Sequence, residues 1–152
     1  MPIKTIGSRD NPEFRQLLSL AEEAKARREA GLTLLDGWHL IEAALQAGHR
    51  PNKLIVAEGQ AWPAEAQDLL RDIPRLIVSG AMMRALSPVK TPTGLMATIG
   101  IPQPAAQAVK FAILLEGIQD PGNLGALLRT AAAAGVEAAY LSTGCADAWS
   151  PK

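Results

Sequence analysis

Residues 113–131, ILLEGIQDPGNLGALLRTA, decide the fold of the carboxy-terminal part of this chain. The stretch opens on an apolar run without polar alternation, which predicts a strand covered on both faces of its sheet. Asp120 and Pro121 come next and favour a helix start, Asp as a cap and Pro at the first helical position. Gly135 is expected to end this helix, and residues 136–141 predict the next strand. A parallel α/β unit follows from this order.

The helix in this stretch carries a single cation on an otherwise small and apolar surface. Its expected core-facing stripe consists of Leu124, Leu127, Leu128 and Ala131. Arg129 lies off that stripe among small residues, so its guanidinium is expected to be free to bind a phosphate or carboxylate through its planar fork. By local physics alone, however, a strand, a turn and a helix with one exposed Arg are most often plain scaffold. The stretch contains neither G-x-G-x-x-G nor Gly-Lys-Ser/Thr, which disfavours a dinucleotide or phosphate-loop site.

The upstream sequence alternates helical and strand patterns, which predicts a separate α/β domain over residues 1–100. Such alternation is typical of a parallel or mixed sheet with helices on both faces. Residues 101–108 contain two prolines and no periodicity, so they are expected to be a linker to a second unit over residues 109–152. The expected helices span residues 11–30, 38–45, 63–71 and 81–86, and the expected strands span residues 32–35, 53–57, 74–78 and 93–99.

Composition excludes several classes of protein. The 15 Lys and Arg balance the 15 Asp and Glu, so the chain is not a strongly basic nucleic-acid binder, although a local cluster of cations can still bind phosphate. One cysteine, Cys145, forms no intrachain disulfide, and His39 and His49 have no nearby thiol, so no metal site is expected. No apolar run reaches the roughly 20 residues of a membrane span, and no secretory signal is visible. We therefore expect a cytoplasmic protein.

The segment from Asp120 to Ala131 resembles the first signature motif of the SpoU/TrmH family of RNA ribose 2′-O-methyltransferases. The core of that motif is Asp-Pro-x-Asn-x-Gly-x-x-x-Arg-Thr-Ala, and every fixed position is present here. Gly135-Val136 and Ser150-Pro151-Lys152 also stand where the family has them. So many matches at fixed spacing make this the strongest signal in the sequence.

A weaker resemblance covers the upstream half. The residues from Arg27 to Gly37, and those from Ser87 to Ala97, look like the amino-terminal substrate-binding domain of many family members, which resembles the ribosomal protein L30e fold. Members usually carry Glu where this chain has Asp36. The implied architecture is an L30e-like α/β/α domain over residues 1–100, followed by the start of a SPOUT, or trefoil-knot, α/β domain over residues 109–152.

The resemblance also implies a chemistry and its site residues. Family members transfer a methyl group from S-adenosylmethionine to a ribose 2′-hydroxyl of structured rRNA or tRNA, and they usually form homodimers. The positions of Asn123 and Arg129 are held to be catalytic. Lys25, Arg27 and Arg28 are expected to contact RNA phosphates, the alternative being a solvated helix end that complements the helix dipole. Neither DNA nor a membrane is an expected partner.

In the family, the cofactor lies in a knot formed by later motifs that have no counterpart before Lys152. We therefore expect no cofactor-binding residue in this chain and no activity of the chain alone. Two other classes stay open at this point. One is a non-catalytic RNA-binding module, and the other is a structural partner that completes its sheet by dimerising.

Overall fold

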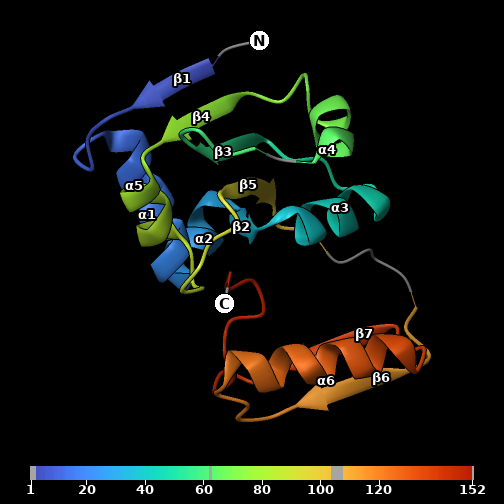
Figure 1. Ribbon diagram of the computed structural model, residues 1–152. Coiled ribbons are helices and arrows are strands. Elements are labelled where there is room, and N and C mark those ends of the chain that lie inside the picture. Colours follow the sequence, from blue (N-terminus) through green and yellow to red (C-terminus); the bar gives the residue numbers. More distant parts are fainter. Residues whose placement is uncertain (1–2, 62, 104–107, 152) are drawn as a thin grey trace. The chain divides into compact units, whose positions relative to one another are not determined.

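The computed structural model describes residues 3–61, 63–103 and 108–151 of the chain. They form two units (Figure 1), unit 1 reaching Pro102 and unit 2 running from Gln103 to Ser150. The linker expected at residues 101–108 spans this division, and residues 104–107 of it lie outside the described part.

Unit 1 is built on a mixed five-stranded sheet with the order β1-β4-β3-β5-β2. The strands β1, β4 and β3 run parallel, whereas β5 lies between β3 and β2 and is antiparallel to both. The sheet is therefore mixed, one of the two arrangements that the sequence predicts. The strands are β1 (Ile3–Ile6), β2 (Leu32–Asp36), β3 (Lys53–Ala57), β4 (Arg75–Val78) and β5 (Leu95–Gly100).

Helices cover both faces of this sheet, as Figure 1 shows. On one face, Phe14 of α1 and Met82 of α5 are buried in a core with Ile55. On the other face, Ile41 of α3 and Ala66 of α4 are buried in a second core. The residues of β2, β3, β4 and β5 are therefore buried or half-buried, apart from Gly100, which is the reason these strands are largely apolar. The helices are α1 (Pro12–Glu22), α2 (Ala24–Ala30), α3 (Trp38–Gln46), α4 (Ala64–Leu69) and α5 (Gly80–Leu86).

Two elements of unit 1 differ from the sequence prediction. The helix expected over residues 11–30 is two helices, because Glu23 adopts an extended conformation with φ −113° and ψ 116° between α1 and α2. Strand β1 was not predicted at all. It pairs only with β4, at the edge of the sheet, and three of its four residues are exposed.

Unit 2 consists of β6 (Ala112–Leu115), α6 (Pro121–Ala133) and β7 (Ala138–Leu141). The two strands pair in parallel, with Leu114 opposite Tyr140, which confirms the expected strand–helix–strand order. The buried hydrophobic side chains among the described residues of this unit are Leu115, Leu124 and Ala131. Leu127 is 37% exposed, so the expected core stripe of α6 is narrower than predicted. None of the helices in the described residues is both long and apolar enough to cross a membrane.

Candidate functional site

The start of α6 is fixed by the residues that the sequence singled out. The Asp120 side chain accepts a hydrogen bond of 2.7 Å from the backbone N–H of Asn123, and Pro121 occupies the first turn. This cap satisfies one of the N–H groups that a helix leaves unpaired at its beginning. It also fixes the backbone of Asn123 one turn into the helix, with the side chain exposed.

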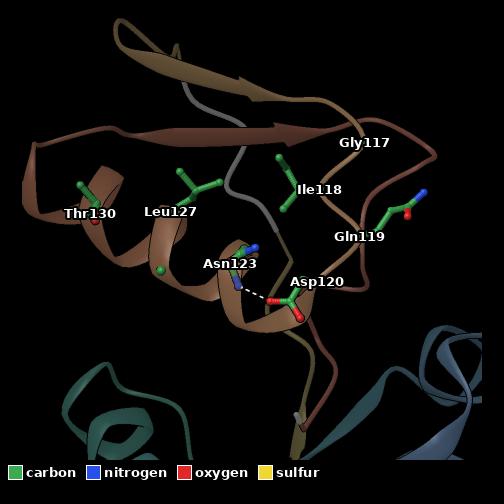
Figure 2. A pocket seen from close by; sticks show the side chains of 8 residues that line it. Gly117, Ile118, Gln119, Asp120, Asn123, Leu127 and Thr130 are labelled. Carbon is green, nitrogen blue, oxygen red and sulfur yellow. Dashed lines mark hydrogen bonds between the residues drawn. The ribbon is translucent and has the colours of Figure 1, made fainter.

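A cleft of about 540 Å³ lies beside this helix start, between α6 and the segment that follows β6. Figure 2 shows Ile118 and Leu127 facing one another across the cleft, and Gln119 pointing outward. The lining is mainly aliphatic, and its polar side chains come from the loop and from one face of α6. The lining residues are Gly117, Ile118, Gln119, Asp120, Asn123, Ala126, Leu127 and Thr130.

Arg129 belongs to the same helix but lies outside the set of residues that line this cleft. It follows Asn123 by six residues, or about one and two-thirds turns, so the two side chains leave different sides of α6. The guanidinium extends back along the helix, because a Cβ placed at Gly125 would lie 3.2 Å from its Nη1. Arg129 is exposed and has no hydrogen-bond or ion-pair partner within the described residues. Its charge is thus available to an external anion.

The side chains that line the cleft offer few specific contacts to S-adenosylmethionine, the cofactor that the motif implies. That cofactor presents an adenine ring, a sulfonium cation and a carboxylate. None of the lining residues is aromatic or cationic, and the Asp120 carboxylate already accepts the bond that caps α6. We assign no cofactor-binding residue to the described part of the chain. That part also contains no cluster of three or more His, Cys, Asp or Glu side chains able to hold a metal ion.

The three cations expected to contact RNA occupy different environments. Lys25 is exposed and faces Glu29 at 3.7 Å, and Arg28 is exposed as well. Arg27, in contrast, is only 3% exposed, and its Nη1 donates hydrogen bonds to the carbonyl oxygens of Leu20 at 2.7 Å and Ala21 at 3.3 Å. The expectation of an RNA contact by Arg27 is therefore corrected: its guanidinium holds the end of α1.

The Asp36 position, where this chain departs from the usual family residue, has a structural partner. Its carboxylate accepts a hydrogen bond from the hydroxyl of Ser87, which joins the end of β2 to the segment after α5. That segment, residues 87–94, also lies beside two further cavities. Of the residues that line them, the sequence had drawn attention to Asp36 and to Trp38 beside His39, for which core packing was the favoured interpretation over base stacking. The polar cavity residues Arg84 and Lys90 were missed, and the sequence signal nearest to them is the turn-forming composition Lys-Thr-Pro-Thr-Gly at residues 90–94.

Two family models match the chain, one for each unit. Residues 11–97 match the MRM3-like substrate binding domain, and residues 110–152 match the SpoU rRNA Methylase family. The first match covers most of unit 1, and the second begins just before β6 and includes the whole Asp120–Ala131 motif.

Curated relatives match the chain over nearly its whole length. The chain is 37% identical to an uncharacterized tRNA/rRNA methyltransferase of Synechocystis, over 99% of the chain and 57% of that protein. It is 31% identical to the 23S rRNA (guanosine(2553)-2′-O)-methyltransferase RlmP of Bacillus subtilis, over 99% of the chain and 59% of that protein. The chain therefore spans somewhat more than half the length of these relatives.

Solved structures show the same fold. A crystal structure described as an RNA 2′-O ribose methyltransferase matches 97% of the chain and 58% of its own, with a TM-score of 0.78 and 36% identity. The SpoU methyltransferase AviRb from Streptomyces viridochromogenes, solved with AdoMet, matches 93% of the chain and 57% of its own, with a TM-score of 0.80 and 24% identity. Both units have thus been matched by fold and by sequence, and the chain belongs to the SpoU/TrmH family of RNA methyltransferases.

Proposed function

We propose that the protein containing this chain is an RNA ribose 2′-O-methyltransferase that uses S-adenosylmethionine as the methyl donor. The observation that carries the proposal is the complete Asp120–Ala131 motif on α6, with an exposed Arg129 that has no partner in the described part of the chain. The similarity to RlmP, which is named for a 2′-O-methylation of 23S rRNA, supports a ribosomal RNA substrate. The AdoMet-bound AviRb structure supports the cofactor.

The chemistry assigns Arg129 the role of an anion anchor rather than that of a base. A ribose hydroxyl is a poor nucleophile, so its site must stabilise the alkoxide that develops as the proton leaves. An arginine guanidinium stays charged and does not accept that proton. Its fork instead binds the adjacent phosphate in a fixed orientation. Asn123, with both a donor and an acceptor in its amide, is proposed to orient the ribose from the neighbouring side of α6.

The test is methyl transfer by the full natural protein, with tritium-labelled S-adenosylmethionine and a 23S rRNA transcript. A 2′-O-methyl group makes the adjacent phosphodiester bond resistant to alkali, so alkaline hydrolysis maps the modified nucleotide. We expect transfer by the wild type and its loss in Arg129→Lys, because Lys keeps the charge but lacks the fork. Near-normal transfer by Arg129→Lys would refute the anchor role. Absence of transfer by the wild type, together with retained RNA binding, would instead support a non-catalytic RNA-binding module.

Lys25 and Arg28 are proposed as additional phosphate contacts from α2, where both are exposed. A homodimer is proposed for the full protein, on the resemblance to the family, and a cytoplasmic location is proposed as well. Sedimentation velocity on the full protein tests the dimer directly: a monomer at micromolar concentration would refute it.

A further inference from the structure

The segment between α5 and β5, residues 87–94, separates two cavities of unit 1 that have opposite character. One cavity, of about 410 Å³, opens at the start of α3 and is mainly apolar; Asp36, Trp38, His39 and Thr93 are among its lining residues. We call it the α3 cavity. The other, of about 280 Å³, is polar, and Glu58, Gln60, Arg84 and Lys90 are among its lining residues. We call it the α5 cleft.

The two cavities lie side by side, because consecutive residues line one and then the other. Thr93 lines the α3 cavity and Gly94 the α5 cleft, and Ala61 and Gln60 divide in the same way. The wall between them is fixed by a hydrogen bond of 2.8 Å from Ala57 N–H to the carbonyl of Gly94. Gly94 itself has a φ of +82°, and a Cβ there would lie 2.5 Å from the Gln60 side chain. The close approach of the two segments therefore requires glycine.

The α3 cavity has the groups that hold a nucleobase. Its volume falls within the range of about 300–1,000 Å³ typical of small-ligand pockets. Trp38 is half-buried and supplies an aromatic ring for stacking, while His39 and Thr93 are exposed and supply hydrogen-bonding groups. The Asp36 carboxylate accepts the Ser87 hydroxyl and keeps further lone pairs for an amino or imino group of a base.

The α5 cleft has the groups that hold a phosphate. Arg84 and Lys90 are both exposed, and neither has a hydrogen-bond or ion-pair partner among the described residues. Elsewhere in unit 1, Lys4, Arg15 and Lys53 are each paired with a carboxylate. Glu58 is the single acid of the cleft, and as an acceptor it suits a ribose 2′-hydroxyl, the group by which a protein distinguishes RNA from DNA.

We propose that this edge of unit 1 binds one unstacked nucleotide of the RNA, with its base in the α3 cavity and its phosphate at Arg84 and Lys90. An apolar cavity and a cationic cleft that share a wall match the base and phosphate of one nucleotide, which are joined through its ribose. Because the base enters the cavity, the RNA bound here is single-stranded, as in a loop or bulge. The inference rests on the proposed function only for the choice of RNA as the partner.

The experiment measures RNA binding by fluorescence anisotropy without cofactor, so its result is independent of methyl transfer. The probe is a short labelled 23S rRNA transcript centred on guanosine 2553, the nucleotide named for the Bacillus relative. The same transcript annealed to its complementary strand serves as the duplex probe. The test variant is Arg84→Ala with Lys90→Ala. Its matched control is Arg71→Ala with Lys110→Ala, which removes the same charge from two exposed cations that line neither cavity.

We expect the single-stranded probe to bind more tightly than the duplex. The Arg84/Lys90 variant should lower the slope of log Kobs against log salt concentration by roughly 0.7, as expected when one single-stranded phosphate is no longer neutralised. The control should leave that slope unchanged. Trp38→Leu, which keeps an apolar side chain against the second core, should weaken binding by roughly five-fold or more through the lost stacking.

The proposal is overturned if the two double variants behave alike, or if duplex and single strand bind equally. It is also overturned if the wild-type chain binds neither probe, for example because the cleft takes an acidic peptide instead. Ultraviolet crosslinking of the single-stranded probe to the wild-type chain tests the site without any variant, so the result does not depend on whether a variant folds. Mass spectrometry identifies the crosslinked peptide. A crosslink in the peptide containing Trp38 and His39 supports the site, and crosslinks confined to α2 or unit 2 refute it.

Discussion

Arg27 shows that a cation near a helix end can serve the fold instead of a ligand. Its guanidinium is buried and donates to two backbone carbonyls at the end of α1. Arg27→Ala removes hydrogen bonds from a charged donor and leaves those carbonyls buried, so the free energy of unfolding should fall by about 2–4 kcal/mol. Urea denaturation measures the change. The exposed neighbour Arg28→Ala is the control and should cost less than about 0.5 kcal/mol; equal effects of the two would contradict this role.

Gly125 illustrates a second residue-scale effect, in which stability and activity move in opposite directions. Glycine inside a helix is less favourable than alanine by about 0.5–1 kcal/mol, so Gly125→Ala should stabilise α6. The new Cβ would, however, lie 3.2 Å from Nη1 of Arg129 and displace its guanidinium. We expect a raised melting temperature together with a lower kcat for methyl transfer in the full protein. Unchanged kcat would show that the position of the guanidinium over Gly125 is unimportant.

At the scale of elements, one carboxylate joins α1 to the sheet. Glu13 accepts hydrogen bonds from Lys4 of β1 and Lys53 of β3. These two hydrogen bonds lower the pKa of Glu13 below its ordinary value of 4.5, and the bond from Lys4 has the larger effect. A carboxyl whose pKa is lower in the folded state than in the unfolded state stabilises the fold at every pH above the unfolded-state pKa. This contribution disappears as the pH falls through the folded-state pKa.

Glu13→Gln should therefore reduce the free energy of unfolding by about 1 kcal/mol at neutral pH, since both pairs are partly exposed. The difference between wild type and variant should shrink as the pH falls below 4.5. Chemical denaturation across that pH range measures it. Asp10→Asn breaks the more exposed pair with Arg15 and serves as the control, with a smaller effect at neutral pH. A difference that grows on acidification would contradict the assigned sign.

The elements that the sequence predicted correctly are those with a strong apolar signal. Strand β3 has the predicted bounds because Leu54, Ile55 and Val56 are all buried. The break at Glu23 was missed because helical spacing continues across it. In the structure Arg27 of α2 donates across the break to the carbonyl oxygen of Leu20 in α1. Strand β1 was missed because an edge strand with three exposed residues carries almost no periodicity.

The site was predictable to a similar degree and for similar reasons. The Asp120–Ala131 motif is local, so its cap and helix could be read directly. Helical spacing alone indicates that Asn123 and Arg129 leave different sides of α6. The structure was needed to show that Asn123 lines the cleft and Arg129 does not. Trp38 is far in sequence from Arg84 and Lys90, which are six residues apart. The antiparallel pairing of β2 with β5 brings Trp38, which follows β2, to the same cavity as Thr93, which precedes β5, and the sequence alone did not show this pairing.

For the whole molecule, the two units differ in how much apolar surface they bury. Unit 1 has a core on each face of its sheet, whereas the described residues of unit 2 bury Leu115, Leu124 and Ala131 and leave Leu114 84% exposed and Tyr140 53% exposed. Hydrophobic burial is the main source of stability, and two strands with one helix supply little of it. The chain should thus consist of a stable unit and a weakly protected one.

This difference predicts two levels of amide hydrogen exchange in the 152-residue chain. Amides of β3 and β5, at the centre of the larger sheet, should exchange only by global unfolding of unit 1. Amides of β6 and β7 should exchange much faster, through local opening of unit 2, and the same should hold for α6. Exchange followed by mass spectrometry on peptides from each unit measures this. Leu114→Ser, on the exposed face of β6, should leave the protection of unit 1 unchanged. Equal protection of β6 and β3 would show that unit 2 is stabilised by something other than its own core.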